Sequence, residues 1–150
     1  MAITRDTRNK NRMTPAKWAG VGFLALFFIA SGASHFLYTT DYTAIIPAWM
    51  PYPQHTVLVT GVIEILFAAL LFAPQTRQII SLWIAVYCLA VLPANVNMLQ
   101  QNLPMFGQTF PPEVLYARIA LQFGIIALAI WAANGKQHLV RYGLSGLFRR

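Results

Sequence analysis

Charged residues and cysteine are both scarce in this sequence. Only 10% of its 150 residues are charged and 57% are hydrophobic, whereas charged residues make up about 25% of an ordinary soluble domain. This balance excludes a water-soluble globular protein. The single cysteine, Cys88, excludes an intramolecular disulfide and a dithiol redox pair.

Motifs for the common redox and nucleotide cofactors are also missing. The sequence contains no haem-ligating histidine pair, no cysteine cluster for a metal and no glycine-rich nucleotide-binding motif. We therefore expect this chain to carry electrons only with a bound cofactor. The composition leaves the identity of any such cofactor unknown.

Long apolar segments dominate the rest of the sequence. A helix needs about 20 mostly apolar residues to cross a hydrocarbon layer of about 30 Å. Four segments reach or approach that length: 18–37, 55–72, 78–99 and 114–133. The sequence thus predicts an all-α protein whose residues 1–150 form one domain, a four-helix transmembrane bundle. The start of the chain also resembles a cleaved signal peptide, but its apolar character continues to Leu37, which favours a span.

The distribution of basic residues accounts for the net charge of +7. Apart from Arg118, every Lys and Arg lies before the first span, at Arg77 in the second loop, or in the tail 135–150. The first and third loops, 38–54 and 100–113, contain none. Basic residues accumulate in cytoplasmic loops, so we expect both termini in the cytoplasm and a bacterial inner membrane as the location. The charge then indicates topology, not nucleic-acid binding.

The first and third loops are rich in proline and aromatic residues. The first loop is too apolar for a solvated loop and too interrupted by proline for a helix, because proline removes a backbone donor. We expect both loops to cap the outer end of the bundle.

Two charged residues fall inside the predicted spans, Glu64 in the second and Arg118 in the fourth. A charge costs about 2.5–3.5 kcal/mol at the centre of an inserted helix, so such residues usually face the bundle and have partners. Both lie toward the outer side, and we expect them to pair. The pair is either a structural clamp or part of a functional pocket.

Further polar residues lie toward the same outer side of the bundle. Gln122 follows Arg118 by four residues and shares its helical face, while the first and third spans contribute Ser31, His35, Asn95 and Asn97. This convergence predicts a buried polar pocket. A binding site there requires a cavity of about 300 Å³ or more, whereas a structural cluster requires none.

Several short strings resemble the DoxX-like family of small four-helix membrane proteins. They are residues 31–36, 47–51, 61–65, 92–98 and 118–122. The resemblance implies association with a membrane oxidoreductase, because the family is named for a subunit associated with a thiosulfate:quinone oxidoreductase. It also marks Glu64, Asn95, Arg118 and Gln122 as family-motif residues.

The sequence therefore supports a DoxX-like membrane subunit or binding module for a small quinone-like or lipid molecule. The expected partners are the lipid bilayer and oxidoreductase subunits, and a homo-oligomer is compatible with the sequence. One alternative is an intramembrane lipid-modifying or isomerising enzyme that uses Glu64 and His35 as an acid/base pair. Others are a small transporter and a purely structural subunit.

Overall fold

The computed structural model describes residues 13–133, which are helical and contain no strand. Four long helices, each long and apolar enough to cross a membrane, form the bundle: α2 (Pro15–Leu37), α4 (Pro53–Phe72), α5 (Arg77–Gln101) and α6 (Pro112–Ala132). Their ends differ from the predicted spans by at most three residues. The tail 135–150 lies outside the described residues.

Prolines account for most of the difference at the helix starts. Pro15, Pro53 and Pro112 are the first residues of α2, α4 and α6. Proline suits this position because its missing N–H has no intrahelical partner there. The side chain of Thr14 also accepts a hydrogen bond from the backbone N–H of Lys17 at 3.3 Å, which caps the start of α2.

The first outer loop contains a short helix, α3 (Thr39–Ala44), so the prediction that proline excludes a helix throughout this loop was wrong. The prolines begin only at Pro47, which leaves the preceding residues free to turn. The hydroxyls of Thr39 and Thr43 donate to carbonyls one turn earlier, each at 2.8 Å. Hydroxyl groups bonded in this way are compatible with a helical backbone.

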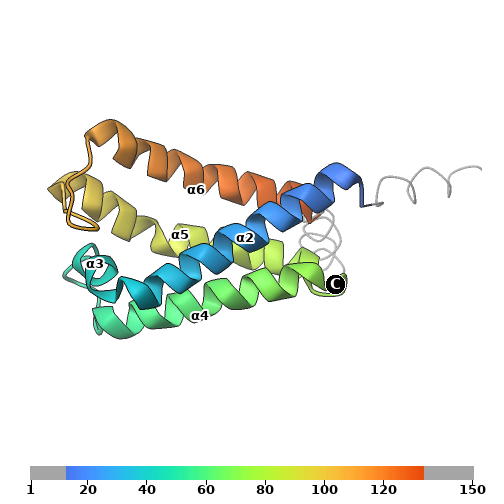
Figure 1. Cartoon of the computed structure of the whole chain (residues 1–150), viewed down its shortest axis with the longest axis horizontal. Coiled ribbons are helices and arrows are strands. Elements are labelled where there is room, and N and C mark those ends of the chain that lie inside the picture. Colours follow the sequence, from blue (N-terminus) through green and yellow to red (C-terminus); the bar gives the residue numbers. More distant parts are fainter. Residues whose placement is uncertain (1–12, 134–150) are drawn as a thin grey trace, which may run out of the picture.

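The long helices pack as two pairs that diverge toward one end of the bundle (Figure 1). Helix α2 lies along α4, where Gly32 and Gly61 bring the two backbones close together, and α5 lies along α6. The pairs meet where α2 begins and α6 ends, with Gly20 against Ala132. We call this the terminal end. At the opposite end, the loop end, α2 and α6 are separated in Figure 1.

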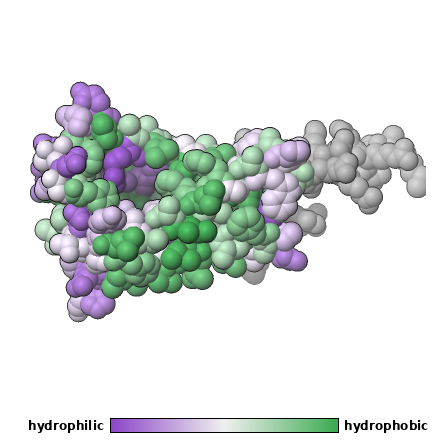
Figure 2. All heavy atoms as spheres, viewed as in Figure 1, coloured by the Kyte–Doolittle hydropathy of each residue, from purple (hydrophilic) through white to green (hydrophobic). Residues whose placement is uncertain are grey.

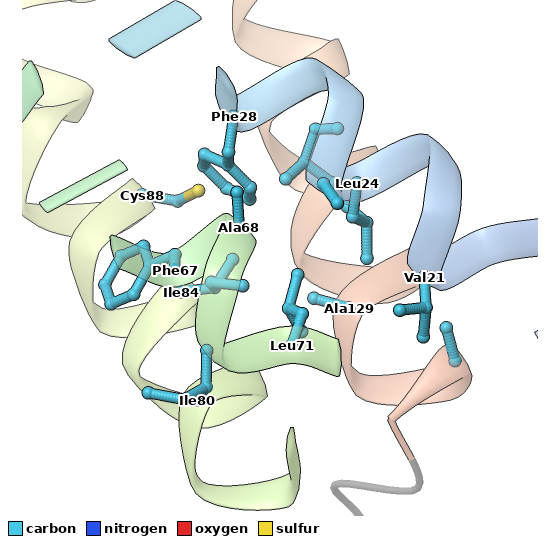
Figure 3. Packing of buried hydrophobic residues seen from close by; sticks show 13 residues of the cluster. Val21, Leu24, Phe28, Phe67, Ala68, Leu71, Ile80, Ile84, Cys88 and Ala129 are labelled. Carbon is cyan, nitrogen blue, oxygen red and sulfur yellow. The ribbon is translucent and has the colours of Figure 1, made fainter. Parts of the chain in front are cut away.

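A dry core fills the half of the bundle near the terminal end. It is built from all four long helices, and Leu24, Phe28, Leu71 and Ile84 are at most 1% exposed. Figure 3 shows these side chains converging between the helices, with Cys88 and Phe67 beside them. The core joins the two helix pairs at this end.

A second, smaller apolar cluster closes the loop end. It consists of Ile45, Met98, Met105 and Leu115, which come from the segment after α3, the end of α5, the third loop and the start of α6. We call these residues, with α3 and the third loop, the cap. The backbone N–H of Phe106 donates to Asp41 Oδ1 at 3.0 Å, which joins the third loop to α3.

The outward surfaces of the long helices are apolar. Large side chains such as Leu26, Leu66, Trp83 and Leu121 are each more than half exposed. Figure 2 shows hydrophobic residues over the middle of the molecule and more hydrophilic residues at the loop end. Exposed surfaces of this kind suit a multi-pass membrane protein, because hydrocarbon and not water then covers them.

Candidate functional site

A cavity of about 680 Å³ lies between the core and the cap. All four long helices line it, and Phe28, Cys88 and Ile125 of the core form part of its wall. Most of the lining is apolar, as expected of a small-molecule site with a few placed polar groups. Figure 2 shows a hydrophilic hollow in the loop half of the molecule, between α6 and α2, where the helix pairs diverge.

Six of the seven polar residues predicted from the sequence line this cavity. They are Ser31, His35, Glu64, Asn95, Arg118 and Gln122. The cavity is larger than the minimum of about 300 Å³ expected for a binding site. The convergence that the sequence indicated is therefore present in the fold.

Glu64 is the most deeply placed charge in the cavity wall. It is 6% exposed, and its Oε1 accepts a hydrogen bond of 2.7 Å from the hydroxyl of Tyr87 on α5. Its second oxygen, Oε2, is buried and accepts no hydrogen bond, although the Ser31 hydroxyl of α2 interacts with the same carboxylate. A buried carboxylate oxygen without a donor costs about 1–3 kcal/mol or more, so this atom marks an incomplete site.

His35 faces the unpartnered oxygen across a gap of 4.0 Å between its Nε2 and Glu64 Oε2. Its other ring nitrogen, Nδ1, lies 3.0 Å from the carbonyl of Val57 and 3.0 Å from Thr60 Oγ1. A carbonyl only accepts, and the Thr60 hydroxyl already donates to the same carbonyl at 2.8 Å. Nδ1 must therefore carry the proton, and Nε2 of the neutral ring is an acceptor.

A series of hydrogen bonds between polar side chains lies along the opposite wall of the cavity. Arg118 Nη2 donates to Asn95 Oδ1 at 3.2 Å, and Asn95 Nδ2 donates to Gln122 Oε1 at 3.1 Å. The Gln122 amide then donates to the carbonyl of Cys88 in α5. Arg118 Nη1 also contacts Met105 Sδ of the cap at 3.6 Å. These bonds fix the amides and hold Arg118 at the cavity.

The predicted pairing of Glu64 with Arg118 was wrong. Arg118 gives its hydrogen bonds to Asn95 and Met105, and Glu64 takes its hydrogen bond from Tyr87. The cavity separates the two walls, so each charge finds a neutral partner on the neighbouring helix or cap. A direct clamp between α4 and α6 is therefore absent.

Asn97 is the predicted site residue that does not line the cavity. It follows Asn95 by two residues, which turns its side chain about 200° around the helix. Its Nδ2 donates to the carbonyl of Ile45 at 3.0 Å, and its Oδ1 accepts from Gln101 at 2.6 Å. Asn97 therefore holds the cap against α5.

Sequence reasoning missed Ser34, Tyr42, Thr60 and Tyr87, which also line the cavity. Thr60 precedes Glu64 by one helical turn, a spacing that placed it on the same face. The hydroxyls of Tyr42 and Ser34 share a hydrogen bond of 2.7 Å, and the Tyr42 ring packs on His35 at 4.1 Å between centroids. Tyr42 belongs to α3, so no pattern within the spans pointed to it.

The described residues contain no group of three or more His, Cys, Asp or Glu side chains arranged to hold a metal ion. The polar groups of the cavity instead offer separate hydrogen-bonding positions. These are the acceptor pair of Glu64 and His35 on one wall and the donors of Arg118 on the other.

Residues 24–133, more than two thirds of the chain, match the family described as a domain of unknown function, DUF8561. No curated protein and no solved structure matches the chain. The matched segment runs from near the middle of α2 to one residue past the end of α6, and it includes every residue that lines the cavity.

Proposed function

We propose that this chain, which belongs to the DUF8561 family, is an integral membrane protein whose cavity binds a small amphipathic molecule such as a lipid or a quinone. The observation that carries the proposal is the buried, unpartnered Oε2 of Glu64 beside a cavity of about 680 Å³. A cluster that served only to hold the helices together would be dry, filled and fully bonded.

The direction of the hollow supports entry from the bilayer. It opens between α2 and α6, and the outward surfaces of both helices carry exposed apolar side chains such as Leu26 and Phe123. A molecule dissolved in the bilayer meets this opening sideways. Its apolar part fits the apolar lining while its polar head reaches Glu64, His35 or Arg118.

We further propose that the terminal end faces the cytoplasm of a bacterial inner membrane. The absence of Lys and Arg from residues 38–54 and 100–113 supports this orientation. The cavity then lies in the half of the bundle toward the outer leaflet. The basic tail 135–150 is expected at the cytoplasmic surface.

The resemblance to DoxX-like proteins extends the proposal to a partner. A module that holds a quinone beside an oxidoreductase subunit suits a chain that has no electron-carrying motif of its own. The residues of the cavity fit such a group, because Arg118 has donors to offer a carbonyl and the apolar lining accommodates a ring and tail. In this role the chain binds and orients the quinone.

An acid/base enzyme is the second candidate. It is favoured because the side chains of His35 and Glu64 face each other in the cavity. Their 4.0 Å separation places two proton-accepting atoms at the same point of a cavity that an apolar substrate can enter. Either atom can take a proton from a substrate carbon or hydroxyl placed between them. This activity requires the same binding event, so one experiment bears on both candidates.

The proposal is tested by native mass spectrometry of the protein purified in a mild detergent. Ala94 lines the cavity, so Ala94→Phe fills it, and Val91→Phe does so from the previous turn. Ala127→Phe makes the same change as Ala94→Phe on an exposed face of α6 and serves as the control. We expect a co-purified small molecule with the wild type and Ala127→Phe, and its loss in the filled variants. Equal occupancy in all four proteins would contradict the proposal.

A further inference from the structure

Two acceptors without donors face each other in the cavity. Glu64 Oε2 accepts no hydrogen bond. Because Nδ1–H points to Val57 and Thr60, Nε2 of the neutral His35 ring carries the lone pair. The two atoms are 4.0 Å apart. Protonating Nε2 does not close this gap, because an N–H···O hydrogen bond spans about 2.7–3.2 Å. The Ser31 hydroxyl interacts with the Glu64 carboxylate but leaves Oε2 unsatisfied, so a bound molecule with two donors would complete the pair.

The charges in the cavity disfavour an ionic head group. Glu64 and Arg118 give the cavity one carboxylate and one guanidinium, which balance formally. A third full charge would stay unbalanced among apolar side chains, where an unpaired ion is costly. An uncharged head group adds no such cost.

The geometry selects the form of the donors. A single hydroxyl has one proton and satisfies one acceptor, which leaves the other acceptor bare. Two hydroxyls on neighbouring carbons supply one proton each, toward Glu64 Oε2 and His35 Nε2. An alkylamine also has enough protons, but it is a cation near neutral pH, which the charge balance disfavours.

We infer that the cavity takes an uncharged amphiphile whose head carries two adjacent hydroxyl groups, one donating to Glu64 Oε2 and one to His35 Nε2. This inference rests on the proposed function and names the ligand class of the same site. Both lipids with a 1,2-diol head and reduced quinones with adjacent hydroxyls share this chemistry. The apolar part then lies along the lining from Phe27 and Leu121 toward the opening between α2 and α6.

The test uses ligands that differ only in their donors. A 1-O-alkylglycerol presents the diol, its dimethyl ether keeps the oxygens but has no O–H, and an alkylammonium of equal chain length presents a cation. A long-chain alkylcatechol is the aromatic version of the diol. Binding of each to the full chain in lipid nanodiscs is titrated by native mass spectrometry.

We expect the diol or the catechol to bind about tenfold or more tightly than the dimethyl ether, because an ether leaves both buried acceptors unpaired. Their relative affinities distinguish a lipid diol from a reduced quinone. Equal binding of diol, catechol and ether would overturn the inference, since water then satisfies the acceptors. The proposed function would still stand in that case, because the cavity binds amphiphiles. Tightest binding of the ammonium would also overturn it. Binding of no probe would remove the proposed function itself.

A matched pair of variants locates the effect. In Glu64→Gln an amide nitrogen replaces Oε2 while the remaining oxygen still accepts from Tyr87, so one of the two facing acceptors becomes a donor that a ligand hydroxyl cannot donate to. The preference for diol over ether should then fall toward one. Glu113→Gln makes the same change at an exposed position outside the cavity and should keep the wild-type preference. A merely structural effect of Glu64→Gln would weaken both ligands equally and leave the ratio unchanged, which would contradict the assignment.

Discussion

At the scale of single residues, the two carboxylate oxygens of Glu64 differ in their hydrogen bonding. Oε1 receives the Tyr87 hydroxyl at 2.7 Å and thereby ties α4 to α5, while Oε2 stays without a donor. A hydrogen bond to a charged acceptor contributes about 1.5–3 kcal/mol, and an unsatisfied buried acceptor costs a similar amount. The two effects nearly cancel, so Glu64 contributes little net stability to the fold.

The Tyr87 bond predicts which partner of Glu64 is energetically coupled. In a double-mutant cycle, Glu64→Gln and Tyr87→Phe should interact by about 0.5–1.5 kcal/mol, because the Tyr87 hydroxyl donates a weaker hydrogen bond to a neutral amide than to a carboxylate. Glu64→Gln and Arg118→Gln should be close to additive, because the cavity separates their side chains. Thermal unfolding of the four proteins of each cycle in detergent measures both quantities. Stronger coupling to Arg118 than to Tyr87 would reject this account of the two walls.

From the buried hydroxyl of Tyr42 we predict that the cap loses stability at alkaline pH. Burial raises the pKa of its hydroxyl above the usual value of about 10. The folded protein thus holds this proton more tightly than the unfolded chain, so the contribution to stability is complete below about pH 10. It is lost as the pH rises through the folded pKa.

Tyr42→Phe tests this effect, because it removes both the titrating group and the 2.7 Å bond with Ser34. The variant should be less stable at pH 8 by about 0.5–1.5 kcal/mol, and the difference should shrink above about pH 10. Melting temperatures of both proteins between pH 8 and pH 11 give the comparison, with exposed Tyr116→Phe as the control. A difference that stays constant with pH would count against the effect.

The polar site could be predicted only as far as helical periodicity reaches. Arg118 and Gln122 share a face by their spacing, and the structure places both at the cavity. The partner of Glu64 could not be read in this way, because Tyr87 lies on another helix whose rotation depends on packing. The acceptor state of His35 depends on a carbonyl of α4, which no sequence pattern marks.

At the scale of helices, the contact of α2 with α4 depends on two glycines. A Cβ added at Gly32 would lie 2.7 Å from the carbonyl oxygen of Gly61, and one added at Gly61 would lie 3.0 Å from that of Gly32. Small residues allow backbones in membranes to approach in this way. Because backbone atoms cannot move aside as a side-chain tip can, either substitution must separate the helices.

Gly32→Ala and Gly61→Ala should each destabilise the protein by about 1–3 kcal/mol, the usual cost of overpacking. Gly22→Ala and Gly124→Ala are matched controls, because an added Cβ meets nothing within 4 Å at either position. Thermal unfolding in one detergent ranks the four variants. The close contact would be unimportant if all four melted together.

The extent of each helix was largely predictable from apolar length and proline. The first turns of α4 and α6 begin at Pro53 and Pro112, two residues before the predicted spans. A prediction from apolar length alone does not include a first turn made of polar residues. Helix α3 was missed because proline density was averaged over the whole loop, although its six residues contain no proline.

At the scale of the whole molecule, the orientation in the membrane is accessible to single-cysteine labelling. In a Cys88→Ala background, Asn102→Cys lies at the loop end and Gln137→Cys lies in the basic tail. We expect an impermeant reagent added to intact cells to label Asn102→Cys and not Gln137→Cys, because the proposed orientation places the basic segments in the cytoplasm. The reverse labelling would show that the protein has the opposite orientation, with the cavity in the inner half of the bilayer.

The packed core near the terminal end also closes the bundle on the side of the cavity away from the cap. Leu24, Phe28, Leu71 and Ile84 close the space beneath the cavity, and in the described part of the chain they are at most 1% exposed. Ions and water that reach the recess meet hydrocarbon side chains instead of a path onward. In a bilayer this half of the bundle would therefore continue the hydrocarbon barrier to ions across the protein.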